Sequence, residues 1–158
     1  TINVLKIRKQ QEERQRIFEN VPVTTKSSLP DIVLPDVNGH KIALSSLKGK
    51  VVLLDFTVYK SDFSPKHNVD LNTVFSKYRN RGVEVYQISF DSDEHFWKNA
   101  SLNIPWVAVH DPESVYSQLL STYNVRNIPT TFIVNRDGEI VARVDDYKKL
   151  ETELGKVL

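Results

Sequence analysis

The sequence of 158 residues contains no cysteine and no methionine. Without a thiol, the chain can form no disulfide bond within itself, has no thiolate nucleophile and cannot build a cysteine metal site. Cysteine usage therefore gives no information about the redox compartment. The chain begins at Thr1 rather than at methionine, so we expect it to be part of a longer precursor, and a missing signal peptide says nothing about location.

A charge imbalance and long apolar runs are absent too. The chain has 21 basic and 20 acidic residues, for a formal net charge of +1. That balance argues against nucleic acid or an anionic membrane surface as a partner. No apolar run is long enough to cross a bilayer, and the five glycine residues form no phosphate-binding loop motif. The 40% hydrophobic and 26% charged residues are typical of one globular domain.

The first 28 residues differ in composition from the rest of the chain. Residues 1–20 have a helical pattern, but residues 8–16 contain no apolar side chain. A helix that is polar in its middle cannot bury a continuous stripe, so we interpret it as a solvated connector. The alternative is a docking helix for a partner or an upstream domain. Residues 21–30 have the composition of a linker, which predicts a connector over 1–28 and a folded domain over 29–158.

Strand and helix patterns alternate from residue 32 onward. Residues 32–44 predict a hairpin with a tight turn at Asn38-Gly39. The continuous apolar run VVLLDF, residues 51–56, predicts a strand buried on both faces. The order strand, helix, strand, helix, strand, strand, helix predicts an α/β fold with parallel pairing first and an antiparallel hairpin last. The remaining predicted elements are helices over 65–79, 113–123 and 147–158, a short helix or turn over 94–100, and strands over 83–90, 130–134 and 139–144.

These elements and their local sequences resemble the thioredoxin fold, and more narrowly the TlpA/ResA-like thiol–disulfide oxidoreductases of the AhpC/TSA group. The resemblance covers residues 29–158 and implies a central mixed β-sheet flanked by helices, with an N-terminal β-hairpin and a leading helix. It also implies a location in the bacterial cell envelope, at the C-terminal end of a longer anchored chain. Four passages carry it: LPDVNGHKIALSSLKGKVVLLDF, SKYRNRGVEVYQISFDSD, NIPWVAVHD and YNVRNIPTTFIVNRDGEIVAR.

The stretch Ile128-Pro129-Thr130 matches the loop that holds the cis proline of this family. In proteins of the family that loop faces the redox corner and offers backbone groups to an extended peptide. The resemblance therefore predicts a cis peptide bond before Pro129, with a trans proline in an ordinary turn as the alternative.

The stretch Ser61-Asp62-Phe63-Ser64 occupies the place of the family's C-x-x-C motif. Disulfide exchange needs a thiolate, and a serine hydroxyl cannot replace it. Dithiol and peroxiredoxin chemistry are therefore excluded for this chain as written. The preceding residues, Thr57 to Lys60, also depart from the family's Trp-Ala-Ser-Trp. This favours natural divergence over the replacement of two cysteines alone.

Ser64 has two further interpretations. Because it precedes Pro65, we expect Pro65 at the first helical position and the Ser64 hydroxyl as the helix cap. Alternatively, Ser64, His67 and Asp70 share one helix face and have the residue types of a hydrolytic triad. Neighbours on one helix rarely provide triad geometry, so we interpret His67 as a solvated helix residue.

Acidic residues stand at the ends of two predicted strands. Asp55 matches the position where thioredoxins carry a buried carboxylate, and with no thiol to serve we interpret it as a structural acid with Lys60 as a candidate partner. The loop after residue 90 lacks the spacing of a calcium-binding loop, so we expect solvated acids and a helix cap there. We expect no metal site and no cofactor. The cluster in that loop comprises Asp91, Asp93, Glu94 and His95.

The favoured hypothesis is a redox-inactive binding domain that takes a peptide or protein partner in the groove between the former C-x-x-C site and the proline loop. Tyr59 and Phe63 would anchor the partner, which predicts an exposed apolar patch there. The candidate groove residues are Tyr59, Lys60, Asp62, Phe63, Ile128, Pro129 and Thr130.

Two other hypotheses remain open. The chain is a thiol–disulfide oxidoreductase if the natural gene carries cysteines at positions 61 and 64, or if they lie elsewhere in a longer protein. It is a scaffold module if residues 1–20 hold an adjoining upstream domain. We expect no nucleic-acid partner and no transmembrane segment within this chain.

Overall fold

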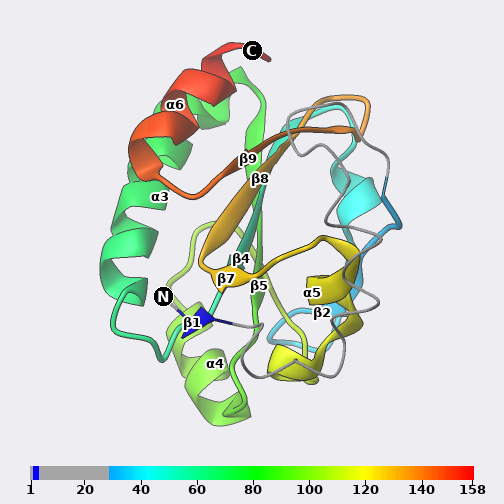
Figure 1. The fold of residues 1–158 in the computed structure, drawn as a ribbon, viewed down its shortest axis with the longest axis vertical. Coiled ribbons are helices and arrows are strands. Elements are labelled where there is room, and N and C mark those ends of the chain that lie inside the picture. Colours follow the sequence, from blue (N-terminus) through cyan, green and yellow to red (C-terminus); the bar gives the residue numbers. More distant parts are fainter. Residues whose placement is uncertain (1, 4–28) are drawn as a thin grey trace.

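The computed structural model describes residues 2–3 and 29–158 and is built around a mixed five-stranded sheet with strand order β6-β5-β4-β8-β9 (Figure 1). Strands β4, β5 and β6 run parallel, whereas β8 is antiparallel to both β4 and β9. The predicted α/β fold of thioredoxin type, with parallel pairing first and a final hairpin, is thus confirmed. The strands are β4 (Val51–Thr57), β5 (Val83–Ser89), β6 (Val107–His110), β8 (Thr130–Val134) and β9 (Ile140–Val144).

Strand β4 lies at the centre of the sheet and all of its residues are buried. Successive side chains of a strand point to opposite faces. Val51 and Leu53 therefore pack into one hydrophobic cluster, and Val52, Leu54 and Phe56 pack into the other. The apolar run that predicted a doubly buried strand supplies both cores.

Helices α3 (Ser64–Tyr78) and α6 (Tyr147–Gly155) cover one face of the sheet (Figure 1). Leu71, Val74 and Phe75 of α3 are buried against it, at the spacing that places side chains on one side of a helix. Leu150 and Leu154 of α6 are buried against the same face. This layer fixes the position of α3, whose first turn follows the former C-x-x-C site.

The other face is covered by the N-terminal hairpin, β2 (Val33–Pro35) and β3 (Lys41–Ala43), and by α5 (Gln118–Thr122). Its core is rich in aromatic rings. Phe56 contacts Phe90, Tyr123 and Phe132, with ring centroids 5.5, 5.8 and 5.6 Å apart. These are favourable separations for aromatic pairs.

The hairpin is confirmed, but the tight turn predicted at Asn38-Gly39 is part of a longer loop. Pro35 pairs with Lys41, so residues 36–40 form the loop. The Asp36 carboxylate accepts hydrogen bonds from the backbone N–H groups of Asn38 and His40, both at 2.9 Å, and this widens the turn. Gly39 alone takes a positive φ there, +82°.

Two predictions in the second half of the domain need correction. Strand β6 is missing from the predicted elements, although VAVH is an apolar run that pairs with β5. The predicted helix over 113–123 is broken at Ser117, between a 3-10 turn over Ser114–Tyr116 and α5. The Ser117 hydroxyl accepts the Leu119 N–H and donates to Asp111, so it caps a new helix instead of continuing one. The short helix α4 (Glu94–Ser101) is as predicted.

The start of the chain forms β1 (Ile2–Asn3), which pairs antiparallel with β7 (Asn127–Ile128). The predicted helix over 1–20 is therefore wrong at residues 2–3, because their backbone is extended in a strand pair. The rest of that helix and the linker up to residue 28 lie outside the described residues. Within the part of the chain that the structure describes, no helix is both long and apolar enough to cross a membrane.

Candidate functional site

The former C-x-x-C stretch forms the corner between β4 and α3. Helix α3 begins at Ser64, which is buried, while Ser61 is half-buried and its carbonyl accepts the Ser64 N–H at 3.1 Å. The predicted Ser64 cap is wrong. Phe63 holds the cap position, and no side chain provides the cap hydrogen bond. Pro65 is the second helical residue, one position later than predicted.

Asp91 ties this corner to the end of β5. Its carboxylate accepts hydrogen bonds from the backbone N–H groups of Tyr59 and Lys60, at 2.8 and 3.0 Å, and from the Ser89 hydroxyl, at 2.5 Å. The interpretation of Asp91 as a solvated acid is wrong, since the residue is 2% exposed. Two of its partners are backbone groups far away in the sequence, which no local pattern reveals.

The other acidic residues of that loop are exposed, as predicted. Asp93 caps α4 by accepting the Phe96 N–H at 3.1 Å. Lys60 lies 3.8 Å from Asp93 and 5.8 Å from the centre of the Phe96 ring. Lys60 is therefore not the partner of Asp55, and the exposed end of α4 borders the corner.

Asp55 pairs with His67 of α3. Nε2 of the imidazole lies 2.9 Å from each carboxylate oxygen, Asp55 is fully buried, and the His67 side chain is 18% exposed. The interpretation of His67 as a solvated helix residue is wrong. It also does not pair with Asp70, whose carboxylate instead binds Lys66 at 2.8 Å, so the triad on one helix does not form.

A buried network extends from this pair. The Gln87 amide donates to Asp55 at 2.9 Å, and its carbonyl oxygen accepts from the Tyr59 hydroxyl at 2.6 Å and from the Trp106 indole at 3.0 Å. Thr131 donates to Asp55 at 2.7 Å. The Asp55 carboxylate, expected as a hydrogen-bonded structural acid, thus has a partner for both oxygens, as a buried charge requires.

The network sets the protonation of two of its members. Burial lowers the pKa of His67, but the charge of Asp55, its hydrogen bond and the charge of Asp70 raise it more, so the pKa lies above 6.5. When protonated, Nε2–H donates to the carboxylate. Burial, followed by the charges of Asp55 and Asp91, raises the pKa of Tyr59 far above its ordinary value. Tyr59 therefore stays protonated and donates its hydrogen to Gln87.

The predicted anchor patch is not present at the surface. Tyr59 is 5% exposed, and half-buried Phe63 packs against the aromatic core. Phe96, which the sequence does not point to, is the exposed aromatic residue beside the corner, at 38%. Lys60 and Asp62 are exposed.

The proline loop lies next to α3. The Ile128–Pro129 peptide bond is cis, Ile128 and Thr130 are buried, and Pro129 is half-buried. The Thr130 hydroxyl donates to the Asn127 carbonyl at 2.7 Å. Pro129 and His67 both line a small hollow of about 40 Å³, so the loop and the first half of α3 meet there. Its other lining residues are Asp70, Leu71, Thr131, Val144, Asp145, Asp146, Tyr147 and Leu150.

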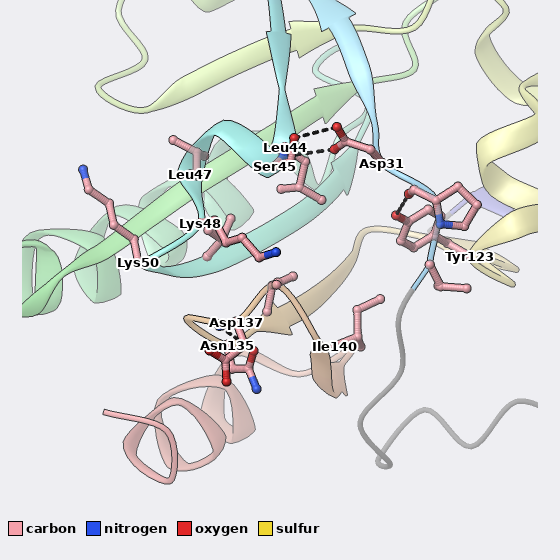
Figure 2. Close-up of a pocket in the computed structure, with 15 residues that line it drawn as sticks. Asp31, Leu44, Ser45, Leu47, Lys48, Lys50, Tyr123, Asn135, Asp137 and Ile140 are labelled. Atoms are coloured by element: carbon pink, nitrogen blue, oxygen red, sulfur yellow. Dashed lines mark hydrogen bonds between the residues drawn. The ribbon is translucent and has the colours of Figure 1, made fainter.

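A larger cavity of about 180 Å³ lies at the opposite end of β4, between the N-terminal hairpin and the β8–β9 turn (Figure 2). Asp31 at its edge is already bonded to the Ser45 backbone and hydroxyl, at 3.0 and 2.6 Å. Lys48 and Asp137 line it together with apolar side chains. Among the described residues, no group of three or more His, Asp or Glu side chains is placed to hold a metal ion.

Comparison with known sequences and structures agrees with this geometry. The chain matches the AhpC/TSA family over residues 25–143. The thiol-disulfide oxidoreductase ResA of a Bacillus cereus strain is 32% identical over 135 residues, which are 81% of this chain and 75% of that protein.

Solved structures give the same result. The solution structure of an uncharacterized thioredoxin-like protein from Bacteroides vulgatus has a TM-score of 0.76 and 44% identity, covering 84% of this chain and 92% of that one. A thiol-disulfide oxidoreductase from Bacteroides fragilis NCTC 9343 has a TM-score of 0.76 and 26% identity, over 84% and 100% of the two chains. The chain therefore belongs to the AhpC/TSA family, as a TlpA/ResA-like protein of thioredoxin fold whose C-x-x-C positions hold serine.

Proposed function

We propose that this chain is a redox-inactive thioredoxin-like domain that binds an extended segment of a peptide or protein partner beside β7, in the bacterial cell envelope. The observation that carries the proposal is the pairing of β7 with an extended segment in a chain that has no thiol. The envelope location and an adjoining upstream domain rest on the family resemblance and belong to the same proposal.

The geometry of β7 supports strand addition. β7 lies outside the five-stranded sheet, and among the described residues its one strand partner is β1. Asn127 is exposed, so this end of β7 lies at the surface. Addition of a strand to an exposed edge draws its affinity from main-chain hydrogen bonds, and side-chain pockets add specificity. A partner bound this way needs no sulfur chemistry.

In this proposal the corner, the proline loop and the exposed end of α4 supply the remaining contacts. Lys60 and Asp62 offer exposed charges of opposite sign, and Pro129 and Phe96 offer partly exposed apolar surface. Ile128 and Thr130 contribute backbone only, because their side chains are buried. Phe63 is half-buried and contributes its exposed edge. Tyr59 acts from inside, by holding the corner through its hydroxyl and its backbone N–H.

The second candidate function is the oxidoreductase activity for which the relatives are named. It requires cysteines that this chain does not contain. Reading the natural gene at positions 61 and 64 separates the two candidates, because two cysteine codons there would restore the dithiol motif and overturn the redox-inactive assignment.

Site-specific photo-crosslinking in expressing cells tests the proposed function. A photoreactive amino acid is placed at Asp62 on the corner, at Asn127 on β7, and at Lys148 on α6 as the control; all three positions are exposed. We expect one partner, identified by mass spectrometry, at both Asp62 and Asn127 and not at Lys148. An adduct equally strong at Lys148, or none at the first two positions, would remove the support for a binding groove.

A further inference from the structure

We propose that the chain's own Ile2-Asn3 segment is the resident occupant of the β7 edge, and that an external partner binds only by displacing it. The inference rests on the proposed function, since it assigns a regulator to the same site. It follows from the strand pair β1–β7, in which Ile2 stands opposite Ile128 and Asn3 opposite Asn127.

The pair places Ile2 and Asn3 directly beside the cis-proline loop. β7 ends at Ile128, and Pro129 follows at once. A two-residue strand already uses the backbone edge that an incoming extended segment would need. Because β1 already pairs with both residues of β7, a partner that uses the same backbone groups must displace it.

The sequence of the segment suits this role. The chain reads Thr1-Ile2-Asn3-Val4, and β-branched residues such as threonine, isoleucine and valine favour extended backbone. The register sets an isoleucine against buried Ile128 and an asparagine against exposed Asn127. The occupant of the edge is thus a short extended peptide with an apolar residue followed by a polar one.

Because β1 and β7 belong to one chain, β1 can occupy β7 even if the free segment binds it weakly. Two segments joined within one chain meet at an effective concentration on the order of 1 mM. If the free segment binds with a dissociation constant of about 0.1 mM, the connected strand occupies β7 roughly ten times more often than it leaves it. The apparent affinity for any other extended segment then falls by about the same factor of ten.

A disulfide trap tests the pairing itself. Because the chain has no cysteine, the double variant Asn3→Cys/Asn127→Cys has only two thiols, placed at directly opposite positions. We expect mild oxidation of the full chain to give an intramolecular disulfide, seen by mass spectrometry and as a monomer on a non-reducing gel. The control, Asn3→Cys/Lys48→Cys, places the second thiol at the other end of β4. Equal oxidation of both variants, or a disulfide-linked dimer, would overturn pairing within one chain.

A binding measurement then tests displacement. The probe is a fluorescent peptide, TINVLKIR, added to the reduced full chain and followed by anisotropy. In Ile2→Pro/Asn3→Pro the segment cannot donate ladder hydrogen bonds, so we expect about tenfold tighter peptide binding than in the wild type. Thr24→Pro/Thr25→Pro is the matched control and should behave as the wild type does. The oxidised trap should bind no peptide.

The outcomes separate the two proposals. Equal peptide affinity in the wild type, the proline variant and the oxidised trap would overturn displacement and leave the binding groove standing. No binding even to the proline variant would overturn strand addition at β7, and with it both proposals. Loss of peptide binding in the oxidised trap together with a stronger affinity in the proline variant would support both.

Discussion

Near the end of β4, two adjacent residues on opposite faces are buried with opposite chemistry. Phe56 enters an aromatic core in which it contacts the rings of Phe90, Tyr123 and Phe132. Asp55, the preceding residue, points to the other face and ends in a network of His67, Gln87 and Thr131. Both residues are fully buried. One strand thus places an aromatic residue and a charged residue next to each other, on opposite faces, beside the same corner.

The comparison distinguishes the residues that stabilise the fold from the residues that position the site. The aromatic face gains from the removal of apolar surface from water, which is the main source of stability. The Asp55 network must first compensate the desolvation of its carboxylate, and a buried ion pair is often no more stable than an apolar replacement. The network therefore defines the position of α3 and of the corner more than it raises the free energy of unfolding.

The largest effect is expected on the aromatic face. Phe56→Ala removes a buried ring that contacts three others, and we expect the free energy of unfolding to fall by about 3–5 kcal/mol. Urea unfolding measures it. Phe96→Ala makes the same chemical change at a ring that is 38% exposed and should cost far less. Equal losses would mean that the aromatic face is not the main source of stability.

A smaller loss is expected when the ion pair is broken. Asp55→Asn and His67→Gln each remove a charged hydrogen-bond partner, and each should lower the free energy of unfolding by about 1.5–3 kcal/mol. The double variant should show a coupling of about 1 kcal/mol or more, because the two side chains contact each other. Asp70→Asn, which breaks a surface pair with Lys66, should leave stability unchanged within error. Additive losses at Asp55 and His67 would contradict a direct pair.

Removal of the hydrogen bond from Tyr59 to Gln87 should lower the free energy of unfolding less than breaking the ion pair does. Tyr59→Phe deletes the hydroxyl that donates to Gln87, whose oxygen still accepts from Trp106. We expect a loss of about 0.5–1.5 kcal/mol by urea unfolding. Tyr116→Phe is the matched control on an exposed ring, and it should change nothing. No loss at Tyr59 would show that its burial alone, without the hydrogen bond, fixes the corner.

The smallest expected effect is a pH dependence of stability that comes from the pair of Asp55 and His67. Because the folded-state pKa of His67 is raised above 6.5, its stabilisation is complete below pH 6.5 and is lost as the pH rises through the folded-state value. The stability difference between the wild type and His67→Gln should therefore shrink as the pH rises from about 5 to about 9. Urea midpoints across that range measure it. For Phe56→Ala the difference should not follow this titration.

Most of the fold could be predicted from local pattern. The predicted strands over 51–56 and 130–134 agree with the observed ones within one residue, because a doubly buried strand must be continuously apolar. Strand β6 escapes prediction because four residues are too few for a periodic signal. The turn at 36–40 and the break at Ser117 depend on side chain–backbone hydrogen bonds, which compete with the regular patterns.

The site is less predictable because its contacts join distant segments. Asp55 is expected as a structural acid, but its partner His67 becomes visible only once α3 packs on the sheet. Tyr59 resembles a surface anchor, since sequence alone does not show that its hydroxyl reaches Gln87. Asp91 likewise resembles a solvated acid among others. In each case the deciding partner lies at least one element away.

The Asp91 carboxylate has a consequence for how fast and how selectively a partner can dock. By accepting the backbone N–H groups of Tyr59 and Lys60, it fixes the corner before any partner arrives. A preordered surface loses little conformational entropy on association, so more of the contact energy remains as affinity. It also needs no rearrangement during the encounter, which favours rapid rigid docking. The corner without thiols thus has the stiffness that the proposed recognition surface requires.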